Sequence, residues 1–83
     1  MTRLVGSQSR PVRSSAAMDV IALLGRNVRV LRTAADLSQE ELAFRASMKR
    51  SYLSDLERGT RNPSVRVGRL AAALGVPPSR LLE

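Results

Sequence analysis

The residues with the clearest chemical potential in this chain are basic side chains gathered in one segment. Lys49, Arg50, Arg58 and Arg61 all lie between positions 49 and 61. Clustered cations of this kind bind polyanions, above all the phosphates of nucleic acids. Any one of them could equally belong to a solvated polar surface, but the cluster as a whole favours contact with nucleic acid.

The distribution of charge along the 83-residue chain supports a local patch. Fourteen Lys and Arg residues stand against seven Asp and Glu residues, which gives a net charge of +7. The excess is +3 over residues 1–18, zero over residues 19–48 and +4 over residues 49–83, where seven basic residues oppose three acidic ones. A neutral stretch followed by a cationic second half predicts one basic face rather than a generally basic surface.

Other kinds of chemistry are excluded by the residue types that the chain lacks. It contains no Cys and no His, so disulfides, thiolate or imidazole metal sites and Cys or His catalysis are ruled out. A chain this short leaves little room for a substrate cleft, so we expect no enzyme activity, no cofactor and no metal. No apolar run reaches the roughly 18 residues of a membrane span, and no signal-peptide pattern follows the start. We therefore expect a cytoplasmic protein without membrane contact.

The basic residues must be positioned by helices, since the chain shows helical apolar spacing. Residues 1–17 are the exception: they are rich in Ser and Arg, lack an apolar repeat, and are predicted to be a disordered basic arm. Residues 18–83 are predicted to fold. Apolar residues at positions 20, 24, 28 and 31 form the stripe of a first helix capped by Asp19. Gly25 inside it indicates either a close approach of another helix or a weak point.

Four more helices follow from capping and stop signals. Ser38 and Glu41 have the spacing of a capping box, and glycines at 59 and 75 mark two helix ends. Pro77 and Pro78 open a last short helix. No alternation typical of strands occurs. The chain is therefore predicted to be all-α, with five helices at approximately residues 19–34, 38–47, 50–58, 64–74 and 77–82.

The second and third predicted helices have helix-turn-helix geometry. A turn of three residues is too short for them to lie antiparallel, so they must cross steeply, with the first supporting the second. A helix about 10–12 Å across fits the major groove of B-DNA, which is about 12 Å wide. Leu53 and Leu56 face inward, and Tyr52 lies toward one edge. The outward face carries Arg50, Ser51, Ser54, Asp55 and Arg58.

Several motifs at consistent spacing strengthen this interpretation. The segments 26–32, 42–43, 52–59, 61–64 and 70–76 resemble the Cro/phage-repressor (XRE) helix-turn-helix family over about residues 24–82. The resemblance implies a compact five-helix, lambda-repressor-like domain that binds double-stranded DNA. Within the family, Arg50–Ser54 with Arg61 and Asn62 is similar to the controller proteins of restriction–modification operons, which are small dimers without an effector domain.

The resemblance also implies roles for individual residues. Arg50 and Ser51 stand at base-reading positions, and Arg50 could bind guanine through two hydrogen bonds. Asp55 stands at a further base-edge position, or alternatively pairs with Arg58 one turn on. The Tyr52 hydroxyl is expected on a phosphate or base edge, with packing over the turn as the alternative. The remaining expected contacts with phosphates or base edges are Gln39, Lys49, Ser54, Arg58, Arg61 and Asn62.

Three features of the sequence carry structural expectations. Arg32 and Glu57 match a partly buried ion pair that joins the first helix to the recognition helix in the family. Ser47 replaces the glycine common in the turn, so a residue with Cβ would have to adopt a positive φ, at a cost of about 1 kcal/mol. The stretch from Ser64 to Leu70 is one residue shorter than the family pattern, which leaves the start of the fourth helix open.

The apolar residues near the C-terminus bear on assembly. Val76, Leu81 and Leu82 are assigned to a dimer contact, with closure of the monomer core as the alternative. Two modules related by a two-fold axis read half-sites about one helical turn apart. The predicted function is therefore a homodimeric, sequence-specific transcriptional regulator on a pseudo-palindromic operator. The alternative is a helix-turn-helix protein-interaction module, such as an antitoxin or bridging factor; RNA binding ranks lower because only two aromatic residues are available.

Overall fold

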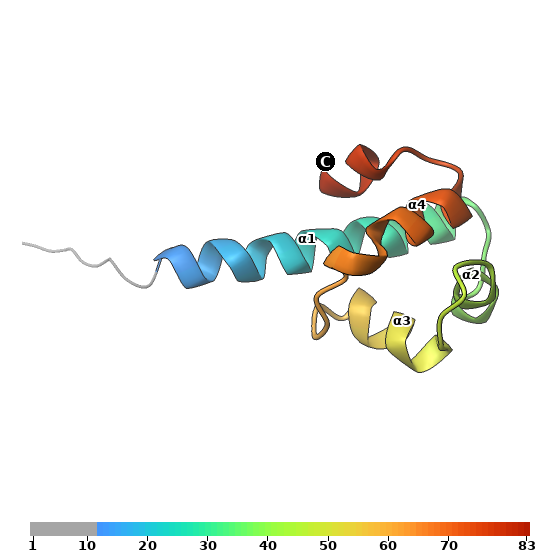
Figure 1. Ribbon diagram of the computed structural model, residues 1–83, viewed down its shortest axis with the longest axis horizontal. Helices are drawn as coiled ribbons and strands as arrows, with labels where there is room; N and C mark the ends of the chain where they lie inside the picture. Colours follow the sequence, from blue (N-terminus) through green and yellow to red (C-terminus); the bar gives the residue numbers. More distant parts are fainter. Residues whose placement is uncertain (1–11) are drawn as a thin grey trace, which may run out of the picture.

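The computed structural model describes the backbone of residues 12–83 and the side chains from Val20 onward. The regular secondary structure of this part of the chain is all helical, and it contains no strand (Figure 1). Four of its elements are α-helices and two are short 3₁₀-helices. In chain order they are α1 (Val12–Ala34), α2 (Gln39–Arg45), α3 (Arg50–Glu57), η2 (Ser64–Arg66), α4 (Val67–Leu74) and η3 (Pro78–Leu82).

Helix α1 begins earlier than the sequence predicted. It starts at Val12 rather than at Asp19, so the expected arm of residues 1–17 is divided. Residues 1–11 lie outside the described part of the chain, and residues 12–17 belong to the helix. In Figure 1 the first half of α1 extends past the other helices, whereas its second half packs beneath α4.

The hydrophobic core lies where the second half of α1 meets the remaining helices. Leu24 and Val28 of the predicted stripe are buried, Leu31 packs against the core from its edge, and Val20 is half exposed outside it. Every other element from α2 onward, η2 excepted, contributes at least one buried residue. The buried apolar side chains are Leu24, Val28, Leu37, Leu42, Ala43, Ala46, Leu53, Leu56, Leu70, Ala71 and Leu81.

The start of α2 and the turn before α3 follow the sequence signals closely. The Ser38 hydroxyl accepts from the Glu41 backbone N–H at 3.0 Å, and the Glu41 carboxylate accepts from the Ser38 N–H at 3.1 Å, so the capping box is confirmed. Ser47 adopts the predicted positive φ, at 57°. Its carbonyl oxygen accepts an exposed hydrogen bond of 3.3 Å from Arg69, which connects the turn to α4.

The C-terminal segment corrects two predictions. The expected fifth helix is the 3₁₀-helix η3, in which Arg80 donates to the Pro77 carbonyl three residues back. Five residues opened by two prolines, which lack N–H donors, are too few to build α-helical turns. Likewise, Ser64 opens the short η2 helix rather than capping α4, which begins at Val67.

Leu81 is a core residue rather than a dimer contact. Its side chain is 0% exposed, and its carbonyl oxygen accepts a buried hydrogen bond of 2.8 Å from Asn27 of α1. A side chain already enclosed by its own subunit has no surface to offer a second copy. The alternative in the sequence analysis, closure of the monomer core, therefore holds for Leu81.

Candidate nucleic-acid interface

Helices α2 and α3 form a helix-turn-helix in which α3 presents its outer face to solvent. Figure 1 views α2 almost along its axis while α3 is seen from the side, so the two cross steeply, as the short turn required. Leu53 and Leu56 of α3 are fully buried, whereas Arg50 and Ser51 are exposed. The first turn of the face predicted to read bases is thus exposed.

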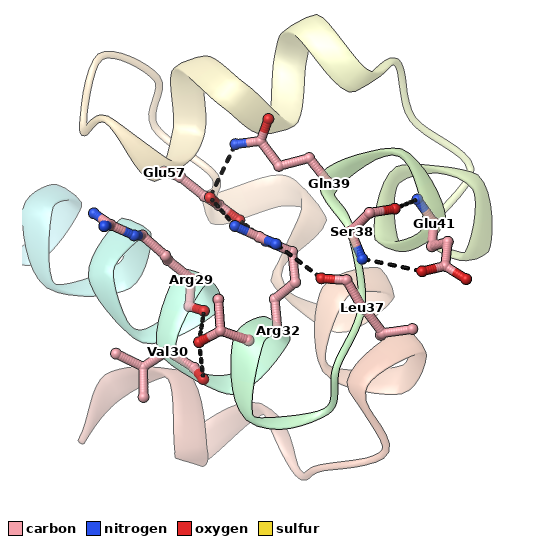
Figure 2. A network of polar contacts seen from close by, with 9 residues as sticks. Arg29, Val30, Arg32, Leu37, Ser38, Gln39, Glu41 and Glu57 are labelled. Atoms are coloured by element: carbon pink, nitrogen blue, oxygen red, sulfur yellow. Dashed lines mark hydrogen bonds and ion pairs between the residues drawn. The ribbon is translucent and has the colours of Figure 1, made fainter.

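The C-terminal end of α3 is held by an ion pair that reaches across the core (Figure 2). Arg32 of α1 donates to both carboxylate oxygens of Glu57, at 2.7 and 3.1 Å, with 13% and 4% of the two side chains exposed. The same guanidinium donates to the Leu37 carbonyl at 2.8 Å. The pair expected from the sequence is therefore present, with a geometry that fixes both side chains.

Gln39, expected to contact a phosphate, joins this network. Its side-chain amide donates to Glu57 at 3.0 Å (Figure 2). Helices α1, α2 and α3 are thereby linked through one buried carboxylate. Gln39 is half-buried, so its position is set by the protein before any ligand arrives.

A close backbone approach reinforces the same end of α3. A Cβ added to Gly25 would stand 2.3 Å from the Leu56 carbonyl oxygen and 3.3 Å from that of Glu57. Real Cβ atoms essentially never come that near. Of the two interpretations of Gly25 left open by the sequence, the structure shows the close approach, with α1 lying directly against the last turn of α3.

Asp55, one of the candidate base contacts, is engaged by its neighbours. Arg58 forms an ion pair with it, and Arg61 lies 3.9 Å from its other carboxylate oxygen. Arg58 also donates to the Ser54 hydroxyl at 3.0 Å. The structure thus contains the local pair that was the alternative to base reading, and Ser54, a candidate edge contact, is part of it.

The Tyr52 ring is in contact with two cations. The guanidinium carbons of Arg61 and Arg66 lie 5.0 and 4.8 Å from the centroid of its half-buried ring. Such distances are those of cation–π contacts. The contact of its hydroxyl with DNA remains a prediction.

Arg66 is the residue of this region that the sequence analysis missed. Helical periodicity gave no guide to it, because it lies in the irregular stretch whose start the sequence left open. The 3₁₀ turn of η2, in which the Arg66 N–H donates to the Pro63 carbonyl at 2.8 Å, brings it to the ring of Tyr52. Only the shortened spacing after Ser64 hinted at unusual geometry there.

The remaining candidate contacts are exposed around the same region. Lys49 and Arg50 are exposed, and within residues 20–83 neither forms an ion pair. Asn62 is exposed and accepts from the Ser64 N–H at 3.0 Å. The region around the outer face of α3 therefore contains five cations and one carboxylate, that of Asp55. The cations are Lys49, Arg50, Arg58, Arg61 and Arg66.

The other two residues assigned to a dimer contact differ from Leu81. Val76 is half-buried against the core, and Leu82 is 56% exposed. They remain available to a second copy.

In the described part of the chain, no helix has the length and apolar character needed to cross a membrane.

Comparison with known proteins agrees with this architecture. Residues 23–83 match a family described as "Helix-turn-helix domain". The control protein C.BamHI of Bacillus amyloliquefaciens is 46% identical over 63 residues, which cover 74% of this chain and 78% of that protein.

Solved structures give the same picture. The restriction-modification controller protein C.AhdI from Aeromonas hydrophila is 47% identical, with a TM-score of 0.71 over 74% of this chain and 94% of that one. The hypothetical transcription factor NHTF from Neisseria is 40% identical, with a TM-score of 0.73 over 77% of this chain and 73% of that one. The sequence relatives and the solved structures therefore agree: both indicate a helix-turn-helix protein similar to transcriptional regulators.

Proposed function

The chain belongs to the helix-turn-helix domain family of DNA-binding regulators, and from that premise we propose that it is a controller of a restriction–modification operon. It would act as a homodimer on a pseudo-palindromic operator and occlude or recruit the transcription machinery at a promoter. Two of the similar proteins are named a control protein and a restriction-modification controller protein. Their identity of 46–47% over about three quarters of this chain supports the proposal.

The single observation that carries the proposal is the contrast within α3. Its C-terminal end is locked by Arg32 and Gln39, while Arg50 and Ser51 are left exposed at its first turn. A rigidly held helix with free polar side chains at its start suits insertion into a major groove. We assign base reading to Arg50 and Ser51.

Contacts with the sugar–phosphate backbone would surround these base readers. The side chains that we assign to phosphates or base edges are Gln39, Lys49, Tyr52, Ser54, Arg58, Arg61 and Asn62. If each subunit neutralises about four phosphates, the logarithm of the binding constant falls against the logarithm of salt concentration with a slope of about −7 for the dimer. A titration that gave a slope shallower than about −3 would contradict this footprint.

The experiment that tests base reading is selection of bound duplexes from a random pool, repeated with Arg50→Ala. Loss of a bidentate contact with guanine removes about 1–3 kcal/mol of discrimination at one base pair. We expect that pair to lose its preference in each half-site while the other positions keep theirs. Unchanged preference at every position would show that Arg50 does not read a base.

We assign the dimer contact to exposed apolar surface near the C-terminus. Val76 and Leu82 keep exposed surface near the C-terminus, whereas Leu81 is enclosed. A single module reads only a few base pairs, so a second copy is needed for a specific site. Sedimentation of Leu82→Asp beside the parent chain tests the assignment, because a charge at the contact shifts the dimer toward monomer.

One observation favours the second candidate, a protein-interaction module. Phe44 of α2 is 85% exposed, and exposed aromatic side chains are enriched at protein interfaces. Indifference of binding to the duplex sequence, together with tight binding to a protein, would favour this function over regulation of a promoter.

A further inference from the structure

A hollow beside the recognition helix brings several residues already assigned to DNA together with one cation that is not, Arg66. It has a volume of about 740 Å³ and lies between the turn that precedes α3 and the loop that leads to α4. Three cations line it, Lys49, Arg61 and Arg66, together with Ser51 and the ring of Tyr52. We call it the turn hollow.

Arg66 is the unusual member of this lining. Its Nε is buried and has no hydrogen-bond partner among the described residues, and no ion pair in residues 20–83 includes it. A buried donor without an acceptor is costly, and a charged group more so. What holds the guanidinium in place is the Tyr52 ring, 4.8 Å away.

The charges around the hollow are unbalanced. Arg61 also lies on the Tyr52 ring and has only a long contact of 3.9 Å with Asp55, which it shares with Arg58. Two guanidinium groups thus lie within 5.0 Å of one ring centroid, and within residues 20–83 neither forms an ion pair shorter than 3.9 Å. An anion placed in the hollow would offset this positive charge and accept from N–H donors of both side chains.

We propose that the turn hollow receives a phosphate of the duplex backbone, and that Arg66, held by Tyr52, is a DNA-contacting residue together with Lys49 and Arg61. The inference rests on the proposed function, because it takes duplex DNA as the partner. The hollow adjoins the exposed first turn of α3, since Lys49 and Ser51 both line it. A strand whose bases face Arg50 would pass its phosphates beside it.

The short η2 turn positions Arg66 against the Tyr52 ring. The stretch after Ser64 is one residue shorter than the pattern that the chain resembles, and a 3₁₀-helix takes up the difference. Arg66 is the last residue of that turn and stands over the ring. A longer connection would place a different residue there.

The test is a titration of binding against salt on a duplex selected by the parent chain. We compare the parent with Arg66→Gln and with Arg26→Gln, a matched loss of one charge. Arg26 is exposed on α1 and lies beside η3, away from the hollow. We expect Arg66→Gln to reduce the size of the slope by about 0.9 for each subunit and Arg26→Gln to leave it unchanged.

Tyr52→Leu is the second variant, and it changes no charge. Removal of the ring frees Arg66 from its fixed position, so we expect a shallower slope and a several-fold loss of affinity at low salt. A simple effect of net charge would leave this variant like the parent. Thermal melting by circular dichroism shows whether each variant is folded.

The chain also carries its own optical reporter. Tyr52 is its single Tyr and there is no Trp, so tyrosine fluorescence reports this ring alone. We expect the selected duplex to change the emission of the parent and to change that of Arg66→Gln less. Equal slopes and equal emission changes for parent and Arg66→Gln would overturn the inference while DNA binding stands. Failure of the parent to bind any duplex would instead overturn the proposed function.

Discussion

The two ends of α3 are built in opposite ways. At the C-terminal end Glu57 is 4% exposed, accepts from Arg32 and Gln39, and lies beside the close approach of Gly25. At the N-terminal end the cap residue Lys49 makes no side-chain hydrogen bond to the helix, and the residues after it are exposed. One end is fixed by the protein, and the other is left available.

The start of α2 sharpens this contrast. It has a complete capping box from Ser38 and Glu41, which contributes about 1 kcal/mol to helix stability. The start of α3 forgoes that contribution. The supporting helix and the far end of the recognition helix are therefore held by contacts within the protein, whereas Arg50 and Ser51 at the start of the recognition helix are exposed.

The largest expected effect comes from breaking the fixed end. Arg32→Met would leave the Glu57 carboxylate buried without its cation, which costs about 3–5 kcal/mol of the free energy of unfolding. Urea denaturation followed by circular dichroism measures it. The double variant Arg32→Met/Glu57→Leu removes both charges, and we expect it to recover most of the loss. A double variant no more stable than Arg32→Met would show that the loss does not come from an unpaired charge.

Gly25→Ala tests the close approach at the same end. The added methyl group would collide with the Leu56 carbonyl, so we expect a loss of about 1–3 kcal/mol in the free energy of unfolding. The control is Gly68→Ala in α4, where a Cβ meets nothing within 4 Å. That variant gains up to about 1 kcal/mol from helix propensity. An equal increase in the free energy of unfolding for both variants would contradict the close backbone contact at Gly25.

Ser47→Gly tests the turn between the supporting and recognition helices. Ser47 has a φ of 57°, and a glycine relieves that strain, so the free energy of unfolding should rise by about 1 kcal/mol. The control is Ala72→Gly, which places a glycine at an exposed position inside α4. We expect it to lower the free energy of unfolding by about 1 kcal/mol. Thermal melts of the two variants would differ in sign; a loss in both would mean that the turn is not strained.

Asp55→Asn probes the open face, with the smallest expected effect on stability. Its pairs with Arg58 and Arg61 are partly exposed, so their loss changes the free energy of unfolding by less than about 1 kcal/mol. Removal of the carboxylate frees two cations, and we expect tighter binding with unchanged base preference in a duplex selection. A changed preference at one position would return Asp55 to the base readers.

The sequence predicted the elements whose signals are local. The capping box at Ser38 and the turn at Ser47 were anticipated, and the structure contains both. Residue spacing and capping chemistry determine such features over a few positions. The pairing of Arg32 with Glu57, which are 25 residues apart, was expected only from the family resemblance, and the structure contains it as well. The helix-turn-helix itself followed from the length of one turn.

The differences lie where tertiary packing decides. The burial of Leu81 and the hydrogen bond from Asn27 to its carbonyl oxygen join residues that are 54 positions apart. Arg66 reaches Tyr52 only because η2 turns it there. Neither the spacing of apolar residues nor a motif encodes which of several nearby cations will stack on a given ring.

The close approach of α1 and α3 at Gly25 affects the position of the other end of α3. A helix of eight residues such as α3 is about 12 Å long, so tilting it by about 10° about its last turn would move its first turn by about 2 Å. Hydrogen bonds to base edges tolerate far less than that, on the order of 0.5 Å. Because Gly25 has a hydrogen atom where alanine has a methyl group, α3 keeps its tilt and Arg50 keeps its position, although Gly25 and Arg50 lie at opposite ends of α3.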